Sequence, residues 1–360
     1  MSTSPLFQPL TFAHGPALKN RLVLAPMTNT QSFPDGKLSD DEYHWLTMRA
    51  QGGFALTITA ASHVQAVGQG FPGQIGIFGD QHLEGLSRLA KGIKERGSVA
   101  AVQLHHAGNR SPQKLVGVPV SSSDDPETGA RGLTLEEVEQ VRDDFIAAAK
   151  RAEKAGFDGV QIHGAHGYIL VQFLSPEINK RTDRYGGSLE NRSRLMFEII
   201  DGIRAETGPN FHVGLRLSPE RFGLPLLEVR DVTAEVMKQA KVDYVEISAW
   251  DVDKEPEEEA LKGRKLMSYF TEIERGEVRL GTAGKVHSGP VAAAVIESGC
   301  DFVSIGQAGI LRHDFPLRVE NDPQYQAPPL PVTAEFLHEE GVGVALVDYL
   351  RLRPGFIAAD

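Results

Sequence analysis

The 360-residue sequence contains a single cysteine, Cys300. One thiol cannot form an intramolecular disulfide, and it cannot supply the ligands of a cysteine-bound iron–sulfur cluster or zinc site. The sequence also lacks any run of about 20 apolar residues, and its first twenty residues do not combine a basic segment with an apolar one as a signal peptide does. We therefore expect a cytoplasmic protein that does not insert into a membrane.

Positive charge is also scarce. Lys and Arg number 37 against 48 Asp and Glu, which gives a formal net charge of −11. Such a chain does not attract nucleic-acid backbones or anionic membranes non-specifically, so we expect a small molecule rather than a nucleic acid as its partner. The hydrophobic content of 41% is typical of a globular protein with a large core. The composition leaves the oligomeric state open, and a homo-oligomer is one possibility.

Short apolar runs alternate with longer amphipathic segments along most of the chain. The clearest amphipathic segment is 134–155, where Thr134 and Glu137 form a capping box and Gly156 follows as a stop signal. The alternation predicts a parallel sheet, and eight repeats favour a closed (β/α)8 TIM barrel, an α/β fold, over an open sheet. No Gly-x-Gly-x-x-Gly follows the first strand, which weakens the dinucleotide-binding alternative. The predicted strands are 22–25, 55–60, 99–104, 159–163, 212–217, 244–248, 278–281 and 302–306, and the other predicted helices are 82–96, 189–206, 232–241 and 291–298.

We place a single barrel domain at residues 1–326 and a C-terminal tail at 327–360. The tail is rich in proline at its start and helix-like over 345–352. We expect it to pack on the barrel or on a partner subunit.

In barrels of this kind the chemistry lies at the carboxyl ends of the strands. The densest group of polar residues follows the fourth predicted strand, where His163, His166 and Tyr168 lie within six residues. Imidazoles offer hydrogen-bond donors for an oxygen, and a phenol is a weak acid that is still protonated at pH 7. The three residues are therefore candidates for a catalytic site.

The remaining strand ends indicate a cofactor. Glycines at 281, 284 and 306 allow backbone N–H groups to approach a phosphate, although ordinary tight turns would look the same. Arg216 on a buried strand needs either a salt-bridge partner or an anionic cofactor, and Gln103 can read the edge of a heterocycle or bond a neighbouring strand. A planar, phosphate-bearing cofactor with an imide edge fits this set, and flavin mononucleotide (FMN) is the obvious candidate.

The stretch 161–194, QIHGAHGYILVQFLSPEINKRTDRYGGSLENRSR, resembles the Old Yellow Enzyme family of flavin-dependent ene-reductases. The resemblance begins at LKNRLVLAPMTN near the N-terminus and extends to DFVSIGQAGILRHDFP near residue 316. It implies bound FMN, NADH or NADPH as reductant, and an activated alkene, a quinone or a nitro compound as substrate.

The resemblance also implies a role for each candidate residue. His163 and His166 would bind the carbonyl or nitro oxygen of the substrate, and Tyr168 would supply a proton. Gln307 departs from the family, because many relatives carry arginine there; either Lys285 compensates for the lost charge or the flavin binds more weakly. The implied FMN contacts are Pro26, Met27, Thr28, Ala60, Gln103, Arg216, Gly284, Lys285, Gly306 and Gln307.

Other interpretations remain open from the sequence. A flavin-dependent dehydrogenase or demethylase could use the same barrel, although such relatives usually add a cysteine-ligated cluster that one cysteine cannot build. A metal-dependent hydrolase could use His163 and His166, but it would need further ligands. We interpret 181–187 as scaffolding, with Ser188 capping the next helix. Trp250 at a strand end is more often a packing residue than a pocket wall.

Overall fold

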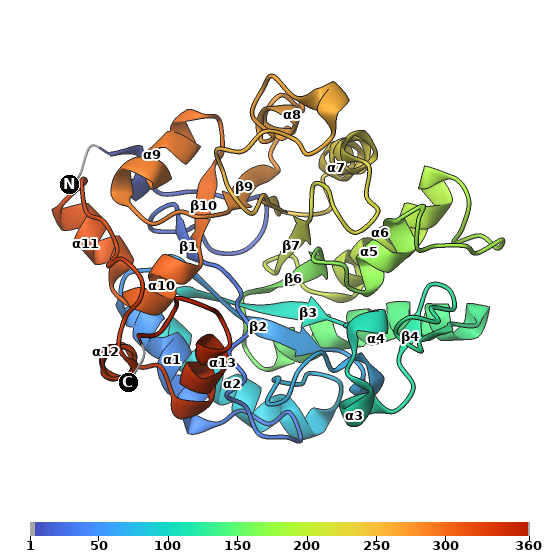
Figure 1. Ribbon diagram of the computed structural model, residues 1–360, viewed down its shortest axis with the longest axis horizontal. Coiled ribbons are helices and arrows are strands. Elements are labelled where there is room, and N and C mark those ends of the chain that lie inside the picture. The colour runs from blue at the N-terminus through green and yellow to red at the C-terminus, as the bar shows by residue number, and fades with distance from the viewer. Residues whose placement is uncertain (1–3, 359–360) are drawn as a thin grey trace.

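The computed structural model describes residues 4–358 and shows a closed barrel of parallel strands with helices around it (Figure 1). The barrel closes because the first strand pairs with both the second and the last. Its strands, in spatial order, are β1 (Leu22–Leu24), β10 (Phe302–Ile305), β9 (Arg279–Ala283), β8 (Tyr244–Ser248), β7 (His212–Leu217), β6 (Gly159–Gly164), β3 (Val99–His105) and β2 (Leu56–His63). The predicted (β/α)8 fold is confirmed.

The long helices pack on the outside of the barrel. They are α1 (Asp40–Gln51), α2 (Leu83–Lys94), α4 (Leu135–Lys154), α6 (Leu189–Glu206), α7 (Leu226–Gln239) and α9 (Gly289–Glu297). Between β3 and α4 lie the short helix α3 (Gln113–Val116) and a small two-stranded sheet of β4 (Val120–Ser121) and β5 (Arg131–Gly132). The sequence did not indicate this small sheet, because two-residue strands carry no periodic pattern.

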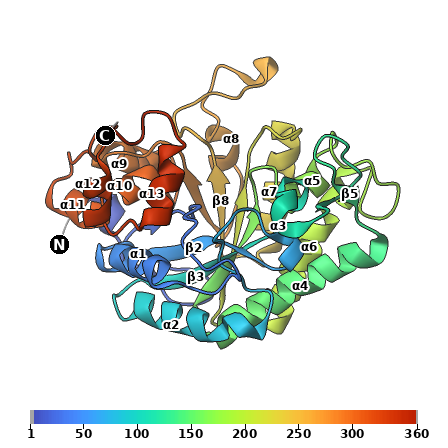
Figure 2. The ribbon, with the colours of Figure 1, turned by 60° about the horizontal axis from the view of Figure 1, so that its bottom comes forward.

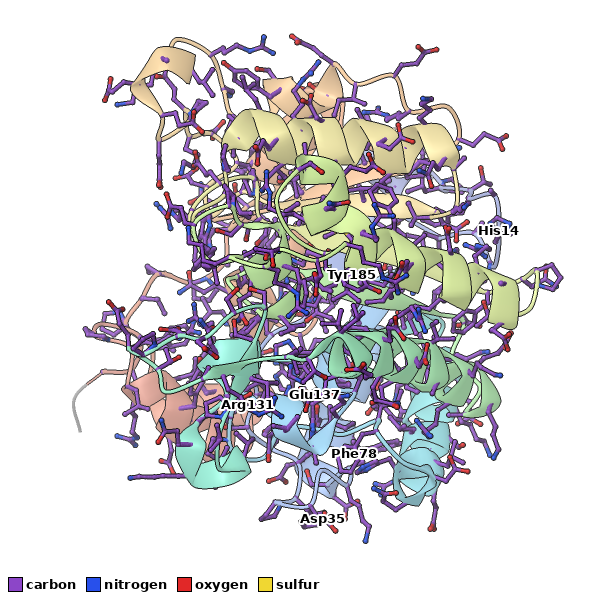
Figure 3. The ribbon with its side chains drawn as sticks, turned by 90° about the vertical axis from the view of Figure 1, so that its right-hand side faces the viewer. His14, Asp35, Phe78, Arg131, Glu137 and Tyr185 are labelled. Carbon is purple, nitrogen blue, oxygen red and sulfur yellow. The ribbon has the colours of Figure 1, made fainter. Side chains whose placement is uncertain are left out.

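The predicted start and end of helix α4 are confirmed. The Thr134 hydroxyl accepts a hydrogen bond from the backbone N–H of Glu137, and the Glu137 carboxylate accepts one from the backbone N–H of Thr134 at 2.9 Å. Glu137 also accepts two hydrogen bonds from Arg131, at 2.6 and 2.7 Å, and the two side chains lie side by side in Figure 3. The Arg131 guanidinium is the main reason that the pKa of Glu137 falls to about 2. At the other end, Gly156 takes a φ of +92°, which glycine adopts without strain.

Two of the long outer helices differ clearly from the prediction. Helix α1 was not predicted, because its buried face includes Glu42, Thr47 and Arg49 and therefore shows no continuous apolar stripe. Helix α7 begins at Leu226 rather than at residue 232.

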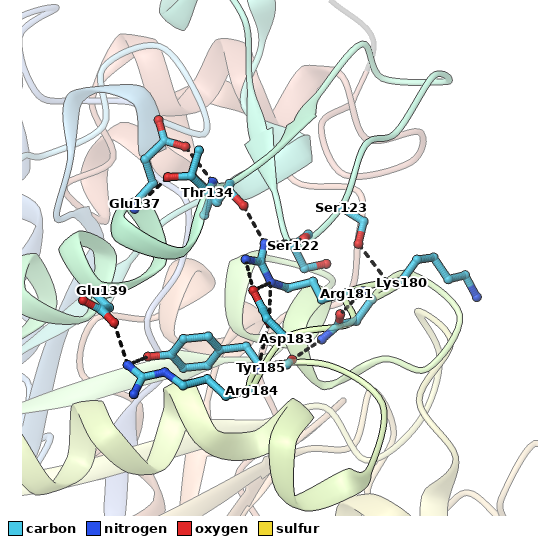
Figure 4. Close-up of polar contacts among 12 residues, drawn as sticks. Ser122, Ser123, Thr134, Glu137, Glu139, Lys180, Arg181, Asp183, Arg184 and Tyr185 are labelled. Atoms are coloured by element: carbon cyan, nitrogen blue, oxygen red, sulfur yellow. Dashed lines mark hydrogen bonds and ion pairs between the residues drawn. The ribbon is translucent and has the colours of Figure 1, made fainter.

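The loop between β6 and α6 is held by a polar brace, shown in Figure 4. Arg181 donates to both carboxylate oxygens of Asp183 and, through Nη1, to the carbonyl oxygens of Ser122 (3.0 Å) and Leu133 (2.6 Å). Ser188 caps helix α6. The interpretation of 181–187 as scaffolding is confirmed by these contacts.

The C-terminal tail lies against its own barrel. Its helices α12 (Ala334–Glu339) and α13 (Val344–Arg351) pack near α1 and near the short α10 (Gln307–Leu311), as both ribbon views show (Figures 1 and 2). The backbone N–H of Gly343 donates to Gln31 at 2.8 Å, and the Thr30 hydroxyl donates to the carbonyl of Ala345 at 3.1 Å. The tail therefore contacts the loop that follows β1. Within residues 4–358, no helix is both long and apolar enough to cross a membrane.

Candidate active site

The carboxyl ends of the barrel strands surround a cavity of about 600 Å³. Its walls come from the loops after β1, β3, β6, β7, β8, β9 and β10, and from the tail. All of the predicted site residues except Ala60 line it, namely Pro26, Met27, Thr28, Gln103, His163, His166, Tyr168, Arg216, Gly284, Lys285, Gly306 and Gln307. The structure therefore brings together residues that lie up to about 280 positions apart in the sequence.

Ala60 lies behind the cavity wall. It is 1% exposed and packs in the apolar core, and its carbonyl accepts hydrogen bonds from the hydroxyls of Thr59 and Ser62. Its neighbour Ala61 lines the cavity instead. Strand β2 shifts register against β3 between Ile58 and Ala61, and a shift of this kind changes which residue faces the mouth without leaving a mark in the sequence.

His163 and His166 form a coupled pair at the end of β6. His166 Nδ1 and His163 Nε2 share a hydrogen bond of 3.3 Å, and His166 Nε2 bonds the Ser248 hydroxyl at 2.8 Å. Burial lowers the pKa of both imidazoles well below the ordinary value, and the nearby positive charge of Arg216 lowers both further. Both histidines are therefore neutral at pH 7. His163 Nδ1 has no partner within the described chain, although it is buried.

Tyr168 lies beside this pair, directly before the short helix α5 (Ile169–Leu174). Its ring makes an edge-on contact with His105, with ring centres 4.3 Å apart, and its centre is 5.3 Å from that of His163. Burial raises the pKa of Tyr168, while the charge of Arg110 lowers it. The net direction is upward, so the phenol stays protonated at neutral pH and can act as an acid.

Arg216 has the salt-bridge partner that was one of the two possibilities from the sequence. Its Nε lies 2.9 Å from Oε1 of the buried Glu246, and its guanidinium also lines the cavity. The second Glu246 oxygen accepts a hydrogen bond from Gln161, whose own amide oxygen accepts one from Gln103 at 2.8 Å. One connected network thus orients both polar residues, Arg216 and Gln103, at the cavity floor.

Several wall residues were not predicted. Trp250, expected to pack, lines the cavity with 40% of its surface exposed, and its ring meets His166 edge-on at 5.6 Å. The loops also contribute Arg110 and Phe222, and the tail contributes Tyr349, Leu350 and Arg353. The position of Trp250 directly after β8 was an available signal, whereas the tail residues had none, because their approach depends on how the chain folds back.

The geometry fits a planar cofactor that carries a phosphate. A Cβ added at Gly306 would meet no atom closer than Met27 Sδ at 3.8 Å, so the backbone there is open to the cavity. A Cβ at Gly284 would lie 2.6 Å from the backbone nitrogen of Asp251, so that loop can pack only with glycine. Lys285, expected to compensate for Gln307, forms a 3.1 Å ion pair with Asp251.

A metal centre is not supported by the arrangement of ligands. Between residues 4 and 358 no three His, Cys, Asp or Glu side chains are grouped so that they could hold a metal ion. His163 and His166 therefore lack the further ligands that a metal-dependent hydrolase needs.

Comparison with protein families decides the class of this protein. Residues 5–326 match the model of the NADH:flavin oxidoreductase / NADH oxidase family. The chain belongs to this family. The matched range includes the whole barrel and leaves the tail helices α12 and α13 outside.

Individual relatives agree with the family. The probable NADH-dependent flavin oxidoreductase YqiG of Bacillus subtilis (strain 168) is 37% identical over 333 residues, which is 89% of each chain. Among solved structures, Old Yellow Enzyme from Pichia sp. AKU4542 matches with a TM-score of 0.79 and 28% identity, over 93% of this chain and 91% of that chain. Morphinone reductase in complex with tetrahydroNAD matches with a TM-score of 0.77 and 26% identity, over 92% and 93% of the two chains.

These comparisons confirm the resemblance to the Old Yellow Enzyme family. The protein is an NAD(P)H:flavin oxidoreductase, with FMN as its cofactor and NADH or NADPH as its reductant.

Proposed function

We propose that this oxidoreductase is an ene-reductase, which reduces the carbon–carbon double bond of α,β-unsaturated carbonyl or nitro compounds. The observation that carries this proposal is the neutral pair His163 and His166 beside the protonated Tyr168, all three on the wall of one cavity. Overall, one alkene, one NAD(P)H and one proton yield the saturated product and NAD(P)⁺.

The cavity floor would hold the cofactor. Pro26, Met27 and Thr28 would lie along the flavin ring, and Gln103 and Arg216 would meet its polar edge. Gly284, Gly306 and Gln307 would contact its phosphate, with Ala61 rather than Ala60 on the cavity side of β2. FMN supplies the exchange of hydride between the nicotinamide and the alkene.

His163 and His166 would bind the substrate oxygen. When the β-carbon of an enone gains hydride, negative charge develops on that oxygen. Each neutral imidazole has one N–H, so the 3.3 Å bond between His166 Nδ1 and His163 Nε2 uses the N–H of one ring. A substrate oxygen bound at these two nitrogens would replace that bond and accept from both rings, while the Ser248 hydroxyl donates to His166 Nε2. Because both imidazoles are neutral, each can donate without the cost of burying a positive charge.

Tyr168 would deliver the proton to the α-carbon. An acid for this step must hold its proton at the working pH and lie next to the site of charge build-up. Its raised pKa meets the first condition, and its 5.3 Å ring contact with His163 meets the second.

The proposal is tested by anaerobic turnover with NADH or NADPH and 2-cyclohexen-1-one, with the products separated by chromatography. We expect one cyclohexanone for each nicotinamide oxidised. The alternative, an amine dehydrogenase or demethylase on the same barrel, predicts no enone reduction and bleaching of the flavin by a secondary or tertiary amine. Nicotinamide oxidation without any cyclohexanone would contradict the ene-reductase proposal.

A further inference from the structure

The charged residues on the cavity wall are all basic. Among the described residues, the lining includes Arg110, Arg216, Lys285 and Arg353 and no aspartate or glutamate. This is unexpected on composition, because acidic residues outnumber basic ones in the chain by 48 to 37. The wall therefore presents a positive potential to whatever enters the cavity.

Two of these basic residues are neutralised by the protein itself. Arg216 lies 2.9 Å from Glu246, and Lys285 lies 3.1 Å from Asp251. Their charges are therefore paired within the protein, Arg216 at the cavity floor and Lys285 in the loop after β9.

Arg110 has no such partner. Within residues 4–358, no carboxylate forms an ion pair with it and no acceptor takes a hydrogen bond from its guanidinium. Its guanidinium is instead held by two aromatic rings, with its central carbon 5.4 Å from the Tyr168 ring centre and 5.7 Å from the Phe222 ring centre. Contacts of this kind orient the planar group and leave its N–H donors available.

Arg353 differs from Arg110 in this respect. Its Nη2 donates to the hydroxyl of Tyr349 at 3.2 Å, and its guanidinium lies over the same ring at 5.2 Å. It belongs to the tail, whereas Arg110 lies in the loop after β3, three residues before helix α3. Arg110 is therefore the better candidate for binding an anion near the reacting groups.

We propose that Arg110 is a specificity-determining residue that binds a carboxylate on the alkene substrate. The proposal rests on the ene-reductase function above. Arg110 and His163 both contact the ring of Tyr168, so a substrate whose carbonyl lies at the histidines can extend its other end toward Arg110. A planar guanidinium matches a carboxylate with two parallel hydrogen bonds. The enzyme therefore favours enones that carry a carboxylate on the far side of the double bond.

The test uses one substrate in two charge states. The probes are 4-oxopent-2-enoate and its methyl ester, which share the alkene and the ketone and differ in the charge at the far end. The quantity measured is the ratio of kcat/KM for the acid to that for the ester. We expect Arg110→Met to lower this ratio about tenfold, and Arg110→Lys to restore part of it, because lysine keeps the charge but loses the planar fork.

The matched control is Lys114→Met. Lys114 lies four residues further on in helix α3, is exposed and lies outside the cavity. The Lys114→Met substitution removes one positive charge from the same region of the surface, so the acid-to-ester ratio of kcat/KM should stay as in the wild type. An equal fall in both methionine variants would show a general effect of net charge and would overturn the assignment to Arg110.

Binding tests the proposal without turnover. Oxidised FMN-loaded enzyme is titrated with 4-hydroxybenzoate and with its methyl ester, and the flavin absorbance is followed. We expect Arg110→Met to weaken the acid about tenfold and to leave the ester unchanged. This result would stand even if no alkene were reduced, so failure of the ene-reductase proposal and failure of the Arg110 proposal give different data.

The anion could instead be the diphosphate of the nicotinamide reductant. In that case Arg110→Met would raise the KM for NADH and NADPH while the acid-to-ester ratio and the two titrations stayed at their wild-type values. That outcome would overturn the substrate assignment.

Discussion

Two regions of the same stretch, 161–194, are equally rich in polar side chains but differ in how those side chains are partnered. In the brace loop, the Arg181 side chain donates to Asp183 and Ser122 (Figure 4) and to Leu133, and Tyr185 donates to Glu198 at 2.7 Å. In the cavity, His163 Nδ1 has no partner in the described chain, and Tyr168 contacts its neighbours mainly through its ring.

The difference separates scaffold from site. A buried polar atom without a hydrogen bond costs about 1–3 kcal/mol, so a fold tolerates it where a ligand or water completes the bond. The motif in the sequence does not show this distinction, because both regions contain the same kinds of residue. Within 161–194, the hydrogen-bond partners seen in the structure show the distinction. Substitutions of the same type in both regions should therefore have different consequences.

The largest effect is expected for Tyr168→Phe. We expect alkene reduction to slow by roughly 10²–10⁴-fold, because the variant lacks the acid, while reduction of the flavin by NADH stays nearly unchanged. Stopped-flow absorbance resolves the two half-reactions. The matched control is Tyr185→Phe, which removes the same hydroxyl from the brace and should leave both rates intact. Equal losses in the two half-reactions of Tyr168→Phe would rule out the proton-donor role.

The next largest effect is expected for His163→Ala and His166→Ala. Losing one oriented donor typically costs roughly 10²–10³ in rate, and both variants should also bind phenols more weakly at the flavin face. Phenol titrations followed by flavin absorbance provide the measurement. Unchanged phenol binding in both variants would place the histidines away from the substrate oxygen.

Glu42 is an intermediate case, because it is fully buried but has partners. It accepts hydrogen bonds from Asn29 (2.9 Å) and from Ser32, and so holds the loop that follows Thr28. Burial raises its pKa to about 7. The folded state therefore binds this proton more tightly than the unfolded state, and stability is greatest below the unfolded pKa and falls as the pH rises toward 7.

The expected loss between pH 4.5 and 7 is at most about 3 kcal/mol, from about 1.4 kcal/mol for each pKa unit. In Glu42→Gln this part of the pH dependence should disappear. Urea denaturation of the two proteins at several pH values measures it. Parallel pH profiles for the wild type and the variant would show that Glu42 does not titrate in this range.

The smallest effect on function is expected for Arg181→Met in the brace. The change leaves the carbonyls of Ser122 and Leu133 without their donor and should lower the free energy of unfolding by about 1–3 kcal/mol. The kcat per bound FMN should stay at the wild-type value. A large loss of kcat with unchanged stability would mean that the brace takes part in the chemistry and would break the comparison.

The features that the sequence predicted are local ones. Helix α4 follows from a capping box and an apolar stripe, and the strands follow from short apolar runs, so the barrel and most of its mouth could be predicted. Helix α1 could not, because Glu42 and Arg49 interrupt its buried face. Ala61 rather than Ala60 lines the cavity, and this depends on a register shift between strands. Tyr349 lies more than 180 residues after Tyr168 in the sequence and reaches the cavity only because the tail folds back onto the barrel.

The most direct test of the central claim is a single turnover without nicotinamide. FMN-loaded enzyme is reduced by light, mixed with 2-cyclohexen-1-one in the absence of oxygen, and followed by flavin absorbance. We predict that the oxidised flavin spectrum returns at a rate that rises with enone concentration, with one cyclohexanone formed for each FMN. A flavin that stays reduced until oxygen is admitted would contradict the account, because the cavity would then bind the cofactor without passing its hydride to an alkene.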